Sequence, residues 1–388
     1  MDKRISRRLL CFAMVFFWAS EYCHAPYFTP YLEELGFSAE IIGIIVGMYG
    51  FTQIFAKIPL GVVTDAFSSY KATILFGTLC TTISSFGLMF ATTFWPIVIC
   101  RILAGLAAST WPAFTVLYNG YFRDDESVTA MANVHGFNNG GKLLAFTLGI
   151  LTATRWGFKI PLFFSFLTGL VAVFLVAFLK PIKLKNESFS FSHVIGVVTH
   201  PVVVVASLFA IFPQFYMQAA AFSFTSSKAR SLGASSFLIG LISLSFTLIQ
   251  VLTSPVVGKK LLKVMKSHSA SALGLLLLAL SSLVIGFADN PYLLIIGNIL
   301  AGVGCLILNA LFMSLVVRSV SEEKRSTAMG FYQAVYGIGM TVGPLMMGAI
   351  VERGGYLPAY NTIGAIMAIG AILALPLISY SEKRLERQ

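Results

Sequence analysis

Long apolar runs dominate this sequence and constrain its fold more than any other feature. A helix of about 20 apolar residues crosses the hydrocarbon core of a bilayer and satisfies its own backbone hydrogen bonds there. Twelve such runs follow one another along the chain, separated by short polar connections. We therefore predict an all-α integral membrane protein with twelve transmembrane helices. The predicted helices span 9–32, 39–64, 70–92, 94–119, 127–152, 160–180, 193–220, 235–257, 269–288, 291–316, 326–350 and 357–380.

The composition agrees with this class of protein. Hydrophobic residues make up 57% of the chain and charged residues only 11%, whereas soluble domains carry about 25% charged residues. The net charge of +11 does not indicate nucleic-acid binding, because the basic residues lie in short clusters between apolar runs. The five cysteines are scattered and form neither a metal-ligand pattern nor a disulfide framework. We expect no metal, no cofactor and no nucleic-acid partner.

The distribution of Lys and Arg predicts the orientation in the membrane. With the N-terminus inside, 20 of the 27 basic residues, Lys57 among them, fall on one side, and five fall on the other. Loops rich in Lys and Arg stay in the cytoplasm. The first run contains Glu21 and His24 and leads into further runs, so we predict a retained helix and not a cleaved signal peptide. We expect a multi-pass protein of the plasma (inner) membrane with both termini cytoplasmic.

The chain also repeats itself at a shift of 197 residues. Leu35-Gly36 falls on Leu232-Gly233, Gln53 falls on Gln250, and the run 102–105 falls on 299–302. One offset shared by separate segments indicates two similar six-helix halves in parallel orientation. We predict a first half at 1–182, a cytoplasmic linker at 183–192 and a second half at 193–388. Transporters built from parallel repeats hold their site between the halves.

Several motifs resemble those of the major facilitator superfamily. The family carries Gly-x3-Asp-basic-x-Gly-basic-basic after its second helix, and here Gly61, Asp65 and Lys71 fit this motif while the intervening basic and glycine positions do not. Arg101 and Gly105 match the Arg-x3-Gly of the fourth helix. The drug-antiporter motif of the fifth helix is degraded, because Phe146 and Ile150 replace its Pro and last Gly.

The resemblance implies a gating role for the loop motif Gly61, Asp65 and Lys71. In the family, such an Asp caps a helix N-terminus of the other half and holds the cytoplasmic side shut. An anion at the positive end of a helix is stabilised by about 0.3–1 kcal/mol, and by more when it is partly buried. The alternative is a solvated Asp65 that only ends its helix.

Charged side chains inside predicted helices are the main functional candidates. An ionisable residue at the centre of a membrane helix costs about 2.5–3.5 kcal/mol, so it is paired, neutral or turned toward water. Such positions are Glu21 and His24, predicted for proton coupling, and Arg101 and Lys142, predicted for substrate binding. The repeat places Gln218 and Asn298 at the positions matching Glu21 and Arg101, so these two join the substrate-binding candidates.

The family resemblance implies that helices one, four, seven and ten line a central cavity, where these residues can meet. Burial favours a neutral carboxyl at Glu21, and a nearby cation favours the carboxylate. Protonation of Glu21 would then release Arg101 or Lys142 to bind an anion. The alternative is a static pair of Glu21 with either cation, which only holds helices together.

Secondary active transport by alternating access is the function that these features favour. The chain has no Gly-x4-Gly-Lys-Ser/Thr sequence for ATP binding and none of the hydrolase motifs, so we expect a transporter driven by a proton gradient and no enzyme. Lys142 favours an anionic metabolite as the small-molecule substrate. A drug or metabolite:proton exporter and a flippase for a lipid-linked substrate remain alternatives. We expect a monomer in the lipid bilayer.

Overall fold

The computed structural model describes residues 3–122, 127–180, 196–197, 199–321 and 324–385, and the regular elements in these ranges are all helical. This confirms the predicted all-α class. The predicted linker 183–192 lies outside the described residues, so the boundaries of the two halves stay a prediction. The elements are α1 Lys3–Tyr22, α2 Ala25–Glu34, α3 Ala39–Ala66, α4 Tyr70–Phe90, α5 Phe94–Ser109, α6 Trp111–Asn119, α7 Ser127–Trp156, α8 Ile160–Ala177, α10 Pro201–Phe209, α11 Ile211–Tyr216, the π-helix η2 Met217–Phe224, α12 Thr225–Ser231, α13 Ser236–Val256, the π-helix η3 Val257–Leu261, α14 Leu262–Val264, α15 Ser267–Phe287, α16 Leu293–Arg318, α17 Arg325–Gly354 and α18 Tyr356–Leu385.

Ten described helices, or runs of helices, are long and apolar enough to cross a membrane. The two other predicted crossings are more polar. The run α1–α2 begins with basic residues and is interrupted at Cys23, and α7 carries Asn138, Asn139 and Lys142. Both still pack inside the bundle, α1 against α7 and α8, and α7 against α13.

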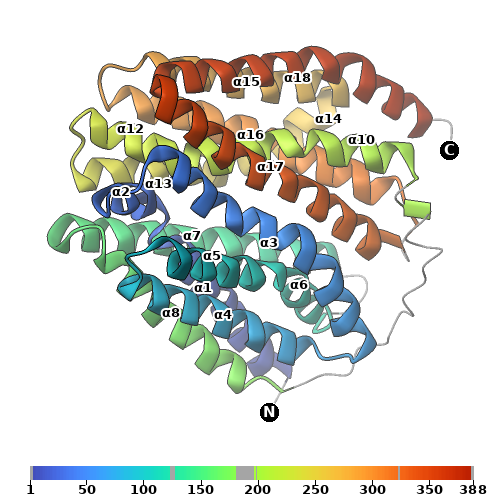
Figure 1. Ribbon diagram of the computed structural model, residues 1–388. Helices are drawn as coiled ribbons and strands as arrows, with labels where there is room; N and C mark the ends of the chain where they lie inside the picture. Colours follow the sequence, from blue (N-terminus) through green and yellow to red (C-terminus); the bar gives the residue numbers. More distant parts are fainter. Residues whose placement is uncertain (1–2, 123–126, 181–195, 198, 322–323, 386–388) are drawn as a thin grey trace.

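The helices form two groups that follow the order of the chain. Figure 1 shows α1 to α8, in blue to green, in its lower part and α10 to α18, in yellow to red, in its upper part. The groups meet along two helix pairs, α3 with α17 and α7 with α13. We call the end of the bundle where the chain begins and ends the inner end, and the opposite end the outer end. The Lys and Arg distribution predicts that the inner end faces the cytoplasm.

The internal repeat is visible where α3 and α13 begin. Gly36 and Gly233, 197 residues apart, have φ angles of +84° and +77°, a conformation that favours glycine. Two residues later, Ser38 and Ser235 cap the following helices by accepting from the backbone N–H groups of Ile41 and Leu238 at 3.4 and 3.3 Å. Each half therefore enters its second helix through the same turn.

The facing surfaces of α3 and α17 are close at the outer end and apart at the inner end. Gly50 packs so tightly that an added Cβ would lie 2.6 Å from the carbonyl carbon of Met340, and at Gly47 it would lie 3.0 Å from the Thr341 oxygen. Gly61 is 18 residues, or five turns, from Gly43 and so lies on the same face of α3. An added Cβ at Gly61 would meet nothing within 4 Å.

The helix α17 is likewise tightly packed at its outer end and open at its inner end. An added Cβ at Gly348, near the outer end of α17, would meet the backbone of Ala39 and Gly43, whereas at Gly330, five turns away on the same face, it would meet nothing within 4 Å. The protein is thus closed at its outer end and open between the halves at its inner end. Pro59 lies inside α3 and Pro255 inside α13, each near the inner end of its helix.

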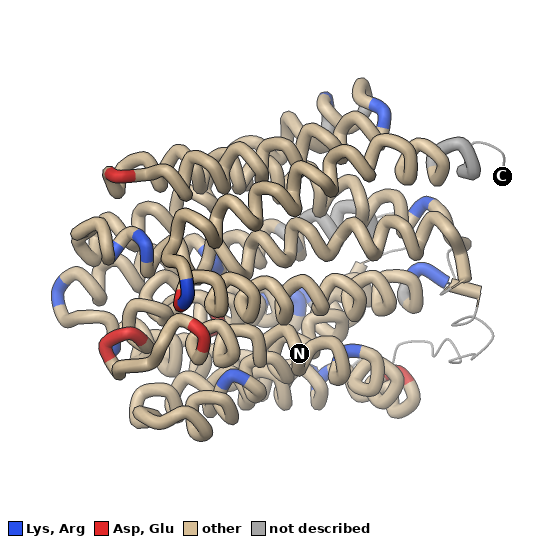
Figure 2. Tube along the Cα trace, turned by 45° about the horizontal axis from the view of Figure 1, so that its top comes forward, with Lys and Arg blue, Asp and Glu red and all other residues tan. Residues whose placement is uncertain are grey.

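Charged residues are concentrated at the ends of the helices. Figure 2 shows most Lys, Arg, Asp and Glu near the two ends of the bundle, with few between them. Four charged side chains are nevertheless at least nine-tenths buried in the described part, namely Glu21, Lys57, Arg101 and Lys228.

Candidate functional site

Three membrane crossings are irregular near the middle of the bundle. The first is broken between α1 and α2, with Pro26 at the start of α2, and the fourth is broken between α5 and α6, with Pro112 at the start of α6. Proline lacks the N–H that would continue the helical hydrogen bonds, so a break there is expected. The seventh crossing contains the π-helix η2, a rare form that often occurs at functional sites.

A cavity of about 40 Å³ lies between the break in the first crossing and the π-helix η2 of the seventh, and Arg101 of α5 also lines it. It has room for about three water molecules, or for a group the size of a carboxylate. Both halves contribute to its wall, α1, α2, α3 and α5 from the first and η2 from the second. The lining residues are Glu21, Tyr22, His24, Ala25, Phe28, Val46, Tyr49, Arg101, Gln218, Phe222 and Ser223.

Glu21 and Arg101 face this cavity without forming an ion pair. Both are 8% exposed, and Glu21 Oε1 and Arg101 Nε have no hydrogen-bond partner among the described residues. The guanidinium of Arg101 instead lies over the rings of Phe28 and Tyr49, at 5.1 and 5.0 Å from their centroids. The static pair of Glu21 with Arg101 or Lys142 is therefore absent from this conformation.

His24 and Gln218 share the cavity wall with this pair. The His24 ring nitrogen Nδ1 is 3.0 Å from the Ser165 hydroxyl of α8, and the ring stacks edge-on against Phe28. Gln218 lies in η2 of the other half. The structure thus brings together four of the six predicted coupling and binding residues. Their predicted roles stay predictions.

Lys142 lies beside the cavity and not in its wall. Its Nζ is 5.0 Å from the centroid of the Tyr22 ring and 5.6 Å from that of Trp18. Tyr22 also lines the cavity, so Lys142 contacts a residue of the cavity wall. Trp18 Nε1 is buried and has no partner among the described residues.

Asn298 lies away from the other predicted residues. It is fully buried in α16, where its Nδ2 donates to the Ile242 carbonyl of α13 at 2.8 Å. This bond holds two helices of the second half together. The repeat correctly matched the helix positions, but it could not show that Arg101 and Asn298 face different surroundings. A substrate contact by Asn298 stays a prediction.

Lys57 is a buried cation that the sequence analysis placed wrongly. We counted it among the cytoplasmic loop charges, but it lies within α3 and is 5% exposed. Its Nζ donates to the hydroxyl of Tyr336 in α17 at 3.2 Å and lies 4.7 Å from that ring's centroid. Its place inside the predicted helix 39–64 was the signal that could have found it.

Comparison with known proteins agrees with this architecture. The family model described as Major Facilitator Superfamily matches residues 10–227 and 207–388. The chain belongs to the major facilitator superfamily. It is 24% identical over 398 residues to the uncharacterized MFS-type transporter MJ1560 of Methanocaldococcus jannaschii, a match that covers 94% of each chain.

Other relatives of this superfamily member are more distant or shorter matches. A segment covering 30% of the chain is 32% identical to the multidrug efflux pump SdrM of Staphylococcus aureus, over 26% of that protein. The crystal structure of the POT family transporter PepTSo has a TM-score of 0.81 at 12% identity and 99% coverage of both chains. The nucleoside transporter NupG has a TM-score of 0.76 at 15% identity, over 97% of this chain and 99% of that one. The chain is thus a membrane-transport protein, and these two solved structures show its fold.

The residues of the superfamily loop motif make their hydrogen bonds within the first half of the chain. Asp65 accepts a hydrogen bond from the Tyr70 hydroxyl at 2.8 Å, within its own half. Lys71 donates to the Ala177 carbonyl at the end of α8 at 2.8 Å. Gly61 faces open space. The predicted gating contact of Asp65 with the other half therefore stays a prediction. It concerns a conformation in which the inner ends of the two halves meet.

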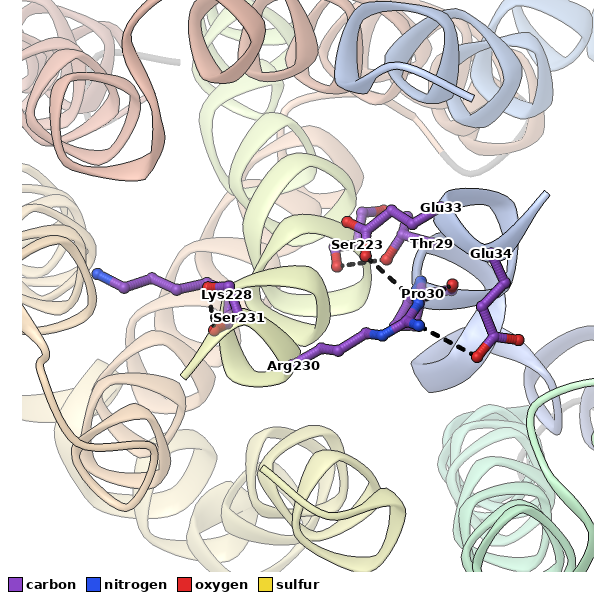
Figure 3. Close-up of polar contacts among 8 residues, drawn as sticks. All are labelled: Thr29, Pro30, Glu33, Glu34, Ser223, Lys228, Arg230 and Ser231. Carbon is purple, nitrogen blue, oxygen red and sulfur yellow. Dashed lines mark hydrogen bonds and ion pairs between the residues drawn. The ribbon is translucent and has the colours of Figure 1, made fainter. Parts of the chain in front are cut away.

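The outer end is closed by polar contacts between α2 and the seventh crossing. Thr29 donates to the Ser223 carbonyl at 2.8 Å, and Arg230 donates to the Pro30 carbonyl at 2.6 Å and to Glu34 at 3.1 Å (Figure 3). Arg230 also lies 3.7 Å from Glu33. We call the Arg230 contacts with Pro30, Glu33 and Glu34 the outer clamp.

One further contact at the outer end joins the two halves, and another lies within the second half. Glu352, near the end of α17, accepts a hydrogen bond from the backbone N–H of Ala39, the first residue of α3, at 2.7 Å. An anion at a helix N-terminus is favourable. Lys228 turns away from the clamp in Figure 3 and donates to the carbonyls of Ile285 and Gly286 at the end of α15. Lys228 is one of the five basic residues that we counted on the outer side, and it is only 5% exposed there.

Proposed function

We propose that this protein is a secondary active transporter that moves a small anionic solute by alternating access, coupled to protons through Glu21. The observation that carries the proposal is the cavity between the halves. The buried carboxylate of Glu21 and the buried guanidinium of Arg101 both line it, each with an unpartnered polar atom and without an ion pair between them. Such residues inside a membrane protein mark substrate or proton pathways.

The charge balance around the cavity supports an anionic solute. Arg101 lines the cavity, Lys142 contacts Tyr22 of its wall, and Lys57 lies further toward the inner end. Against these three cations stands one buried carboxylate, Glu21, among the described residues. Three cations and one carboxylate leave an excess of positive charge in a low-dielectric space, which attracts anions.

Proton coupling follows from competition for Arg101. A carboxylate at Glu21 attracts the guanidinium, and protonation removes that attraction. A bound anion can then take the place of Glu21 as the partner of Arg101. His24 lies in the same wall and can relay the proton, because its ring is held by Ser165. The closed outer end and open inner end supply one of the two states that alternating access requires.

A drug exporter is the second candidate. The observation that favours it is the similarity to SdrM, whose name describes a multidrug efflux pump. Aromatic rings of Tyr22, Phe28, Tyr49 and Phe222 line the cavity and suit an apolar compound. Arg101 in the same wall disfavours the cationic compounds that such rings otherwise attract.

Transport in proteoliposomes tests the proposal. The purified protein would be reconstituted with an imposed pH gradient and given radiolabelled acetate, lactate, benzoate, inorganic phosphate, uridine and ethidium. We expect accumulation of one or more anions that collapses when the gradient is abolished. Glu21→Gln should lose accumulation, whereas Asp289→Asn, a matched change at an exposed outer position, should retain it. Accumulation of ethidium alone, or of nothing, would overturn the proposed anion transport.

A further inference from the structure

A polar row on α3 leads from the cavity toward the inner end. Tyr49, Gln53 and Lys57 are spaced four residues apart and so lie along one face of the helix. Tyr49 lines the cavity, and Gln53 and Lys57 are 3% and 5% exposed. At 1.5 Å per residue, Lys57 lies about 12 Å further along α3 than Tyr49. The cation is therefore separate from the cavity but lies on a row that begins there.

Tyr336 connects this row to the opposite half. It packs against the cluster of Tyr49, Ala104, Ala108 and Met340, so its ring continues the wall that Tyr49 begins. Its hydroxyl accepts the hydrogen bond from Lys57. A hydroxyl that accepts still has its own O–H to donate, and among the described residues no acceptor for it is found.

Within the described ranges no carboxylate balances the charge of Lys57. An ammonium group has three donors, and one of them is used by Tyr336. No carboxylate of the described residues lies within ion-pair distance of Nζ. An uncompensated ammonium group is costly to bury, and an anion that accepts hydrogen bonds from it lowers that cost.

Lys57 also lies where the halves separate. The contact with Tyr336 follows the tight packing of Gly50 on Met340, and one turn beyond Lys57 the face of α3 at Gly61 is open. Lys57 and Tyr336 therefore lie at the inner limit of the close contact between α3 and α17.

We propose that Lys57 and Tyr336 form a second anion-binding site, for a carboxylate or another compact anion, at the inner mouth of the passage between the halves. The ammonium of Lys57 and the hydroxyl of Tyr336 donate to the same anionic group. This inference rests on the proposed anionic solute. It adds a binding site between the central cavity and the cytoplasm. The anionic group of the solute can then pass from Arg101 to Lys57 and remain close to a cationic side chain.

The test measures protection of Lys57 from chemical labelling. The protein in lipid nanodiscs would be reductively methylated with formaldehyde, and the modification of each lysine would be measured by mass spectrometry. We expect benzoate to slow the labelling of Lys57, and the neutral benzamide to have no effect. Lys260, an exposed lysine near the inner end of α13, is the internal reference. Equal labelling of Lys57 with and without benzoate would overturn the proposal.

Two variants separate this site from the cavity and from a merely structural contact. Tyr336→Phe removes one neutral donor, so the benzoate concentration for half protection of Lys57 should rise about three- to tenfold. An unchanged value would refute the two-residue site. Arg101→Met should leave protection of Lys57 in place, and loss of protection in that variant would show that the anion binds only in the cavity. These labelling results do not depend on transport, so failure of the proposed function and failure of this site can be told apart.

Discussion

Arg230 is predicted to hold the protein in its outer-closed state. It joins the two halves through its hydrogen bonds to the Pro30 carbonyl and Glu34 and through its approach to Glu33. Phe158, in the connection between α7 and α8, supports the guanidinium from one side at 5.4 Å. Replacement by Ala removes all of these contacts at once, and every partner lies in the first half of the chain.

The free energy that the outer clamp contributes can be estimated from the exposure of its side chains. A hydrogen bond from a charged donor to a carbonyl contributes about 1.5–3 kcal/mol. The side chains of Arg230 and Glu34 are 34% and 46% exposed, so their ion pair contributes only about 0.2–1 kcal/mol. We take about 2 kcal/mol for the clamp as a whole. Arg230→Ala should then shift the equilibrium between the outer-closed and outer-open states about 30-fold toward opening.

Distance measurement by pulsed electron paramagnetic resonance is the suitable assay. Spin labels at exposed Glu40 and Phe237, near the starts of α3 and α13, report the separation of the halves at the outer end. The native cysteines would first be replaced. We expect Arg230→Ala to move population to longer distances and Arg230→Lys to move less, because Lys keeps the charge but loses the planar fork of donors.

Arg155→Ala is the matched control. Arg155 is an exposed arginine at the outer end of α7 and takes no part in the clamp. Its replacement should leave the distances as they are in the unmodified protein. If Arg230→Ala gave the same distribution as this control, the clamp would contribute nothing to closure and the reasoning from its contacts would be wrong.

Four further predictions concern the interior and the orientation. Glu21→Gln should abolish accumulation driven by a pH gradient while solute exchange continues, and normal accumulation in proteoliposomes would exclude Glu21 as the proton site. Lys142→Met should express normally but weaken binding of an anionic solute, by about ten- to a hundredfold if a charge-assisted contact is lost; unchanged affinity in a binding titration would remove Lys142 from the site. Gly50→Leu should prevent close packing of α3 on Met340, lowering the melting temperature or favouring the outer-open state in the spin-label assay, and an unaltered protein in both measurements would contradict the packing. A cysteine at Asn290 should react with a membrane-impermeant maleimide from the outside, and labelling from the cytoplasm alone would reverse the predicted topology.

The helices and their repetition could be predicted from the sequence because a chain in lipid must satisfy its own backbone hydrogen bonds. An apolar run that is long enough must be a helix, and the match of Gly36 and Ser38 with Gly233 and Ser235 marks the same turn in both halves. The convergence of Glu21, Arg101 and Gln218 on one cavity also agreed with the predicted arrangement.

Other features depended on packing between distant segments. The π-helix η2 has no signal in its own residues, since the sequence there is an ordinary apolar helix. Asn298 is bonded to the backbone of Ile242 because α13 passes close to α16, which no periodicity reveals. Lys57 was misplaced because counting basic residues by side of the membrane takes no account of a lysine held inside a helix by a tyrosine of the other half.

Pro59 makes the inner part of α3 easier to bend than the rest of the helix. It cannot donate the backbone hydrogen bond that would tie it to Phe55, and it follows Lys57, the last contact with Tyr336, by two residues. The residues from Leu60 to Ala66 follow this missing hydrogen bond, and an added Cβ at Gly61 would meet nothing within 4 Å, so this end of α3 has room to bend. Pro255 gives α13 an equivalent joint at nearly the same place in the repeat. In the proposed alternating-access cycle, bending at these two positions closes the inner end while the outer end is still closed, so that a solute is enclosed on both sides before the outer end opens.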